Sequence, residues 1–297
     1  MKKQLQIVCF GEVLFDVFPS HEKIGGAPLN VALRLQSFNN TVYMISGIGT
    51  DEKGADALEY MTTRGLDTSL IQQQDNYKTG LVHVSLDVDG VASYDIASPC
   101  AWDFIAFHPE QLDVVNTADA FVYGSLIARH EVSKHTLFQI LKTTAFKVFD
   151  VNLRQPFITK SVLVSLMQAA DFIKLNNEEL YVISDLLESK YKGVEQNIQW
   201  LAKLTQTKHI CVTKGKFGAV LWYNNAFYYN SGFRAQVNDT VGAGDSFLAT
   251  LIHKLLVGEH PQQAINYACA VGAMVAEKAG ANPELSEKQI ENYINPL

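Results

Sequence analysis

Cysteine is scarce in this sequence, and no two cysteines have the spacing of a metal-binding or redox pair. Four cysteines occur among 297 residues, with no C-x-x-C motif. Three of them lie inside apolar runs, where a reduced thiol packs like a small hydrophobic side chain. A disulfide-stapled secreted fold and a zinc site are therefore not expected, and a reducing cytoplasm is the simpler setting.

Long apolar runs and an excess of basic residues are also missing. No run approaches the roughly 20 residues that a membrane-spanning helix needs, and the apolar stretch after Gln4 is too short for a signal-peptide core. The formal net charge is −7, whereas a nucleic-acid partner would require a basic face. We therefore expect a cytoplasmic protein with no membrane partner and no nucleic-acid partner.

Several common motifs are absent as well. There is no G-x-x-x-x-G-K-[ST] sequence, which excludes a P-loop enzyme. No G-x-G-x-x-G follows the first predicted strand, which removes the main support for a nicotinamide dehydrogenase. The eight histidines show no H-x-x-x-H or H-E-x-x-H spacing, so they receive no metal-binding role.

The composition is that of a globular protein, with 47% hydrophobic and 19% charged residues. A chain of this length fits one large α/β domain or two small ones. Short apolar runs alternate with helical patterns, which is typical of βαβ units around a parallel sheet. The predicted strands are Gln6–Phe10, Thr41–Ile45, Ala120–Tyr123, Phe146–Asp150, Phe172–Leu175 and His209–Thr213, and the predicted helices are Ala27–Gln36, Lys53–Arg64, Ser133–Lys142, Val162–Ala169, Val194–Leu204, Ala243–Leu256 and Pro261–Lys278.

One segment interrupts this alternation and predicts a β-hairpin. Apolar and polar residues alternate over Thr79–Asp87, Asp89-Gly90 supplies turn residues, and Ala92–Ile96 is typical of a return strand. The segment Val13–Phe18 could add a further strand. We interpret these segments as a small antiparallel flap; the alternative is an edge extension of the main sheet.

The most informative segment is Asn238–Phe247, where two glycines precede an apolar-periodic helix. Backbone N–H groups at a helix start are unpaired and carry the positive end of the helix dipole, so they can bind an anion. Asp245 lies in the first turn, where its carboxylate could accept a proton beside that anion. This is the arrangement that phosphoryl transfer needs. The alternative is a simple glycine cap followed by an aspartate.

The string Asp239–Asp245 resembles the D-T-x-G-A-G-D signature of the PfkB family at every fixed position. The resemblance implies an ATP-dependent sugar kinase with bound Mg²⁺, in which Asp245 is the general base and Gly242, Ala243 and Gly244 form the anion hole. It also implies a single ribokinase-like α/β/α domain over residues 1–297, with a mostly parallel central sheet. A lid would be formed by about residues 13–24 and 77–106, and we expect a homodimer through this lid.

The N-terminal segments Gly11–Asp16 and Gly25–Ala32 resemble the first signature of the family. The resemblance implies that Asp16 and Asn30 bind sugar hydroxyls and that Gly26 lets the backbone approach the sugar. Asp16 interrupts an apolar strand, and a charge there needs a partner or a ligand. We also expect Tyr94 and Trp102 to form an apolar wall of the sugar site, with packing inside the flap as the alternative.

Three further segments resemble the family's nucleotide and phosphate motifs. Asp150–Arg154 matches D-x-N-x-R, which implies that Arg154 lies near the transferred phosphate; a salt bridge to a neighbouring acid is the alternative. Asn176–Glu179 matches N-x-x-E, which implies contact with the magnesium-bound phosphates, although an Asn-capped helix start would have the same sequence. Val212–Gly218 resembles V-T-x-G-x-x-G. The nucleotide-contacting residues would be Asn176, Glu179, Thr213, Gly215, Gly218 and Cys269, the last standing where many relatives have a polar residue.

The family resemblance also implies a candidate monovalent-cation site near Asp239 and Gly280, with potassium as the ion. Glu284 departs from the small residue common nearby.

Among the sugar kinases, the first signature, Ala101-Trp102-Asp103 and Tyr123–Leu126 most resemble bacterial fructokinases. The expected reaction is phosphorylation of D-fructose. The alternatives are a kinase for ribose, 2-keto-3-deoxygluconate or adenosine, and a non-catalytic sugar or nucleotide sensor.

Overall fold

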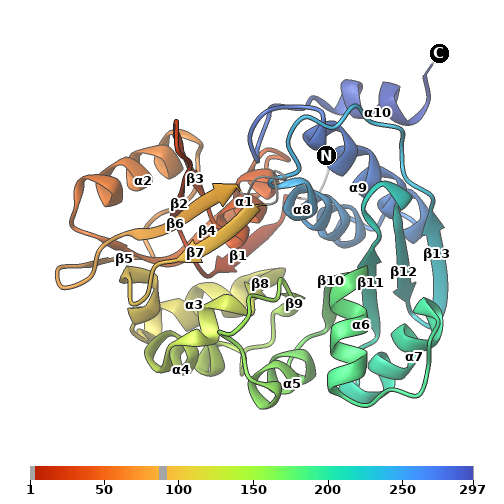
Figure 1. The fold of residues 1–297 in the computed structure, drawn as a ribbon, viewed down its shortest axis with the longest axis horizontal. Helices are drawn as coiled ribbons and strands as arrows, with labels where there is room; N and C mark the ends of the chain where they lie inside the picture. The colour runs from red at the N-terminus through yellow and green to blue at the C-terminus, as the bar shows by residue number, and fades with distance from the viewer. Residues whose placement is uncertain (1–3, 87–91, 297) are drawn as a thin grey trace.

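Buried apolar side chains cover both faces of strand β1 (Gln6–Phe10), as expected for a strand with helices on either side. In the computed structural model, which describes residues 4–86 and 92–296, Ile7 and Cys9 pack into one core. Val8 and Phe10 pack into a second core on the opposite face. The chain is therefore built in three layers around this sheet (Figure 1).

The central sheet has nine strands in the described part of the chain, in the order β13-β12-β11-β10-β9-β8-β1-β4-β5. The strands from β11 to β5 pair in parallel, and β12 and β13 are antiparallel at one edge. The predicted, mostly parallel sheet is confirmed. The bounds are β4 Thr41–Gly49, β5 Ile71–Gln74, β8 Ala120–Gly124, β9 Phe146–Asp150, β10 Phe172–Asn176, β11 His209–Thr213, β12 Ala219–Tyr223 and β13 Ala226–Asn230.

Helices cover both faces of this sheet. Residues of α1, α2, α8 and α9 belong to the core that contains Ile7, and residues of α3 to α7 belong to the core that contains Val8. The last helix, α10, packs on α9. The bounds are α1 Ala27–Gln36, α2 Glu52–Thr63, α3 Pro109–Thr117, α4 Glu131–Ile140, α5 Lys160–Gln168, α6 Asn177–Leu186, α7 Val194–Thr205, α8 Ala243–Leu256, α9 Pro261–Ala276 and α10 Glu287–Ile294.

The predicted flap is a separate four-stranded sheet in the order β3-β2-β6-β7. Its hairpin consists of β6 (Gly80–Leu86) and β7 (Ala92–Ile96), joined by the Asp89-Gly90 segment, which lies outside the described residues. Strand β2 (Leu14–Val17) pairs with β6 in parallel, so the prediction of an antiparallel flap is wrong for this pair, whereas β3 (Glu22–Gly25) pairs with β2 antiparallel. The alternative of an edge extension of the main sheet is therefore wrong.

The structure also contains elements that the sequence pattern did not predict. Strands β12 and β13 form a hairpin whose two turn residues, Asn224 and Asn225, have φ angles of 48° and 64°. Positive φ at both positions is the requirement of a type I′ turn, which asparagine tolerates. Helices α3 and α10 were also missed, and β4 continues to Gly49, four residues beyond its predicted end.

No helix within residues 4–86 and 92–296 is both long enough and apolar enough to span a bilayer.

Candidate active site

A left-handed glycine turns the chain into α8. Gly242 has a φ of 75° and precedes the first helical residue, Ala243. A Cβ atom at Gly242 would lie 2.4 Å from the Cβ of Ala281 and 2.6 Å from its backbone oxygen, so a larger residue would collide there. The first N–H groups of a helix have no intrahelical partner and carry the positive end of the dipole. The start of α8 offers the predicted anion-binding cradle only in part, because the Ala243 N–H already donates to the Thr240 carbonyl oxygen over 3.2 Å.

Asp245 lies in the first turn of α8 and is partly buried. Its Oδ2 accepts a hydrogen bond of 2.8 Å from Asn30 Nδ2. Burial, followed by the negative charge of Asp150, raises the pKa of Asp245 to about 6, while Lys174, the Asn30 hydrogen bond and Arg154 lower it. A carboxylate with such a pKa is ionised at neutral pH yet basic enough to accept a proton in a transition state.

Contacts from α1 and from a C-terminal loop fix the position of this turn. Asn30 Oδ1 accepts a hydrogen bond of 3.0 Å from Asn282 Nδ2. The buried Arg34 donates to Ser246 Oγ over 3.1 Å and to the Pro283 carbonyl oxygen over 2.8 Å. The base therefore sits on a helix start that is held from two sides, which favours a defined geometry.

Asp16 occupies the small sheet directly opposite Lys23 of β3. Burial raises the pKa of Asp16 to about 6, against the attraction of Arg154 and Lys23. A Cβ atom at Gly25 would lie 2.9 Å from Asp16 Oδ2, so this glycine makes room for the carboxylate. Asp16 is thus a partly buried carboxylate whose ionised form its surroundings disfavour.

Glu12 is a buried acid at the site to which the sequence analysis gave no role. Burial raises the pKa of Glu12 to about 7; backbone N–H groups, including that of Ala27, and Arg154 lower it, and Asp245 raises it. Its Oε2 has no hydrogen-bond partner. The sequence did contain a signal for Glu12: it is a charged residue inside the apolar run from Val8 to Phe15, as Asp16 is at the end of that run.

Glu179 does not line the nucleotide pocket. Its carboxylate accepts hydrogen bonds of 2.8 Å from the backbone N–H groups of both Leu153 and Asn176, and the Asn176 side chain caps Glu179 N in return. The interpretation as an Asn-capped helix start is thus confirmed. Glu179 also anchors the loop that carries Arg154, whose charge acts on Asp16, Glu12 and Asp245.

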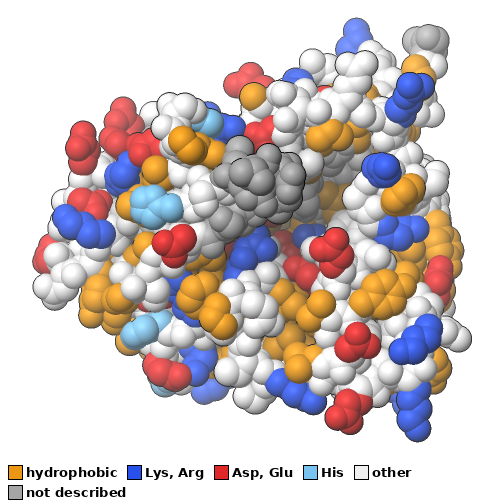
Figure 2. All heavy atoms as spheres, viewed as in Figure 1, with side chains coloured by type: hydrophobic (Ala, Val, Ile, Leu, Met, Phe, Trp, Pro, Cys, Tyr) orange, Lys and Arg blue, Asp and Glu red, His pale blue; other side chains and the backbone are white. Residues whose placement is uncertain are grey.

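A cavity of about 400 Å³ extends from the start of α8 toward α9. Five of the six predicted nucleotide-contacting residues, and Ala243 and Gly244 of the predicted anion hole, line it. Figure 2 shows a hollow near the centre of the view with acidic and basic side chains at its floor, whereas the only charged residue among the described residues that line the cavity itself is Lys216. Burial raises the pKa of the Cys269 thiol to about 12, so it stays protonated and offers only a weak polar contact. The predicted residues that line the cavity are Asn176, Thr213, Gly215, Gly218, Cys269, Ala243 and Gly244.

Asp239, the candidate cation ligand, already has three donors. Its carboxylate accepts from Val241 N at 3.0 Å, Gly280 N at 3.3 Å and the ammonium group of Lys23 at 3.0 Å. Burial would raise the pKa of Asp239, but these donors lower it below its usual value. A potassium ion on this carboxylate would have to displace Lys23, so the residues in this arrangement do not fit the ion.

The prediction that Trp102 forms part of an apolar wall of the sugar site is wrong. This side chain is 0% exposed, and the guanidinium of Arg129 lies 3.8 Å from the centre of its ring. Arg129 in turn forms a buried ion pair with Asp103. Trp102 is therefore a core residue with no ring face open to a sugar. The backbone of Tyr94 belongs to β7, and its side chain lies outside the described part of the structure.

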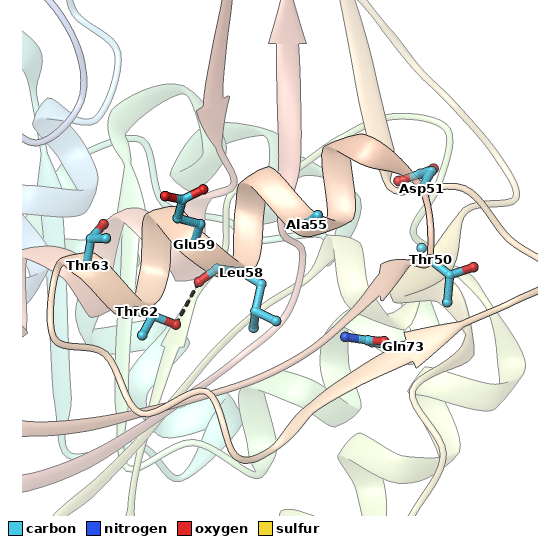
Figure 3. Close-up of a pocket in the computed structure, with 9 residues that line it drawn as sticks. Thr50, Asp51, Ala55, Leu58, Glu59, Thr62, Thr63 and Gln73 are labelled. Atoms are coloured by element: carbon cyan, nitrogen blue, oxygen red, sulfur yellow. Dashed lines mark hydrogen bonds between the residues drawn. The ribbon is translucent and has the colours of Figure 1, made fainter.

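A second hollow, of about 460 Å³, lies along α2 and contains none of the predicted site residues. Figure 3 shows Leu58 and Thr62 of α2 on the side that faces Gln73 of β5. The charged residues that line it, Asp51 and Glu59, are both acidic, which makes it unsuited to the phosphates of a nucleotide.

Comparison with protein families decides the assignment. Residues 4–288 match the family described as "pfkB family carbohydrate kinase". The chain belongs to this family. It is 27% identical to fructokinase-2 of Solanum lycopersicum, covering 94% of this chain and 92% of that one.

Two solved structures share the fold of this carbohydrate kinase. The fructokinase of Xylella fastidiosa with bound ATP has a TM-score of 0.84, 24% identity, and coverage of 99% of this chain and 98% of its own. The 2-dehydro-3-deoxygluconokinase of Thermotoga maritima has a TM-score of 0.86, 19% identity, and coverage of 98% of both chains. At these identities the two structures establish the ribokinase-like fold.

Proposed function

We propose that this carbohydrate kinase transfers the γ-phosphoryl group of ATP to the 6-hydroxyl of D-fructose. The observation that carries the proposal is the position of Asp245. Its carboxylate contacts Asn30, on the side of the predicted sugar residues, while the preceding Gly244 lines the nucleotide cavity. Asp245 therefore stands where an acceptor hydroxyl and a γ-phosphate would meet.

In the proposed reaction, Asp245 accepts the proton of the attacking hydroxyl. The N–H groups of Gly242, Gly244 and Asp245, with Arg154, hold the charge on the transferred phosphoryl group. Asp16 and Asn30 orient the sugar. The small sheet covers it and excludes water, which would otherwise accept the phosphoryl group.

Magnesium would be held mainly by the nucleotide. Within residues 4–86 and 92–296, no group of three or more His, Cys, Asp and Glu side chains could hold a metal ion. Mg²⁺ commonly binds through substrate phosphates and water with few protein ligands, and it would neutralise phosphate charge here. Asn176 is the polar side chain of the N-x-x-E motif that faces this cavity.

Fructose is favoured by the sequence stretches around Gly11–Asp16 and Tyr123–Leu126 and by the fructokinase names of relatives such as that of tomato. Sugar choice in a shared fold depends on few side chains, so ribose, 2-keto-3-deoxygluconate and adenosine are the competing acceptors. A non-catalytic sensor would have no use for the base Asp245.

A coupled assay of ADP release over these four acceptors tests the proposal, with phosphorus NMR of the product to locate the phosphate. Fructose should give the highest kcat/KM, with the phosphate at O6. A higher kcat/KM for another acceptor would overturn the fructose assignment, and no turnover with any of them would favour the sensor.

The small sheet is also the proposed dimer contact. Its core is a small cluster centred on Leu14, Val82 and Val84, and β3 and β7 leave open edges that a second copy could cover. Sedimentation at micromolar concentration should show a dimer. A monomer there would contradict the dimer and leave the kinase proposal intact.

A further inference from the structure

A buried ion pair links the two strands behind the start of α8. Lys174 of β10 and Asp150 of β9 are directly opposite in the parallel register, and Lys174 Nζ lies 3.0 Å from Asp150 Oδ1. The residues are only 7% and 4% exposed. Asp150 Oδ2 is buried and has no hydrogen-bond partner. Such a pair is costly to desolvate and is often no more stable than packed apolar residues. Stability alone therefore does not account for it.

The pair lies immediately beside the proposed base. A Cβ atom built on Gly244 would be 3.5 Å from Lys174 Nζ, so the ammonium group packs against the residue that precedes Asp245. Burial would lower the pKa of Lys174, but nearby carboxylates raise it well above its usual value, so Lys174 is charged. The charged groups around Asp245 are Asp150 of β9, Lys174 of β10, Arg154 of the loop after β9 and Glu12 of the β1–β2 connection, while Glu179 of α6 acts on Lys174.

We propose that Lys174 is a positioning residue that offsets the charge of the buried Asp150 behind Gly244, so that Asp245 stays ionised and able to accept a proton. This inference rests on the proposed role of Asp245 as the base. The two charges act on Asp245 in opposite directions: the carboxylate of Asp150 disfavours its ionised form, and the ammonium of Lys174 favours it. Removing one partner exposes the effect of the other.

The two single variants should therefore shift the pH profile in opposite directions. In Lys174→Met, the unopposed Asp150 should move the acid limb of kcat/KM to higher pH by about one unit or more. In Asp150→Asn, the unopposed Lys174 should move it to lower pH by a similar amount. Below the limb, about one unit corresponds to roughly a tenfold change in kcat/KM. The acid limb of kcat/KM in the double variant should lie near that of the wild type.

The experiment measures kcat/KM for fructose from about pH 5 to pH 9 at saturating MgATP and constant ionic strength. The γ-phosphate titrates equally in all variants, so differences between profiles report on the protein. Lys147→Met is a matched control, because Lys147 also bridges β9 toward the start of β10, 3.5 Å from Asp171, at the opposite end of these strands. Its profile should match the wild type.

Shifts in the same direction, or no shift in either folded variant, would overturn the inference. If Lys174→Met does not fold, Asp150→Asn decides alone: a downward shift supports the inference, and an unchanged or upward limb contradicts it. Asp245→Asn separates this inference from the proposed function. Normal turnover in that variant would remove Asp245 as the base, whereas an inactive Asp245→Asn with unmoved limbs in the other variants would refute only the role of the pair.

Discussion

Replacing Asp245 with asparagine should make the protein more stable while it removes catalysis. The substitution keeps the shape of the side chain and an oxygen that can accept the hydrogen bond from Asn30. It removes the proton acceptor, and loss of a general base typically lowers kcat by about 10²- to 10⁴-fold. It also removes a carboxylate whose ionisation the fold disfavours, and this second effect can be worked out from the structure.

The sign follows from the pKa of Asp245, which folding raises from 3.8 to about 6. Well below pH 3.8 the carboxyl group is protonated in both states and does not affect stability. As the pH rises, the unfolded state ionises first, so the wild type loses stability until the folded group ionises near pH 6. Two pKa units correspond to nearly 3 kcal/mol. Because the side chain keeps some exposure to solvent, we expect about 2 kcal/mol.

Urea unfolding of both proteins at several pH values measures this difference. Asp245→Asn should have a free energy of unfolding about 2 kcal/mol above that of the wild type at pH 8, roughly half that gain at pH 5, and little gain near pH 4. Equal m-values for the two proteins would show that they expose the same surface on unfolding, so their free energies of unfolding can be compared. A pH-independent difference, or a variant that is less stable at pH 8, would refute the reasoning about a strained carboxylate.

Two further predictions concern the small sheet. Asp16→Ala removes a proposed sugar ligand and should lower kcat/KM for fructose by roughly 5- to 150-fold, the equivalent of about 1–3 kcal/mol, with the KM for ATP nearly unchanged. The opposite pattern of KM values would place Asp16 outside the sugar site. The wild type should show equal rates and melting temperatures in potassium and choline chloride, because Lys23 occupies the Asp239 carboxylate. Lys23→Met should gain thermal stability from potassium. If the wild type requires potassium for activity, Lys23 does not occupy the Asp239 carboxylate during turnover.

The sequence predicts best those parts of the site that are local in the chain. The start of α8 at Ala243 follows from Gly242 immediately before an apolar-periodic segment, and the hairpin of β6 and β7 follows from alternation around Asp89-Gly90. Asn176 and Thr213 meet in the nucleotide cavity because they end β10 and β11, and the carboxyl ends of parallel strands meet at one edge of a sheet. Gly244 and Cys269 reach the same cavity from α8 and α9.

Contacts between distant segments could not be read from these patterns. Lys174 meets Asp150 only because β10 lies beside β9 in a particular register. Lys23 reaches Asp239 across 216 positions of sequence, because the small sheet folds back over the segment before α8. Trp102 was expected at the sugar because it is aromatic and follows the flap, but the guanidinium of Arg129 covers its ring in the core.

The acidity of this protein and its proposed phosphate chemistry are compatible because Lys174 and Arg154 place positive charge near the start of α8. The net charge of −7 would weaken the approach of a nucleotide to an ordinary surface. Lys174 is buried against the start of α8, and Arg154 acts on three of the site's carboxylates. The charge of the buried Lys174 is therefore felt in a region of low dielectric, where it has more effect than that of the exposed Arg154. The same low dielectric raises the pKa of Asp245, so the surroundings that favour a bound phosphoryl group also make the base more basic.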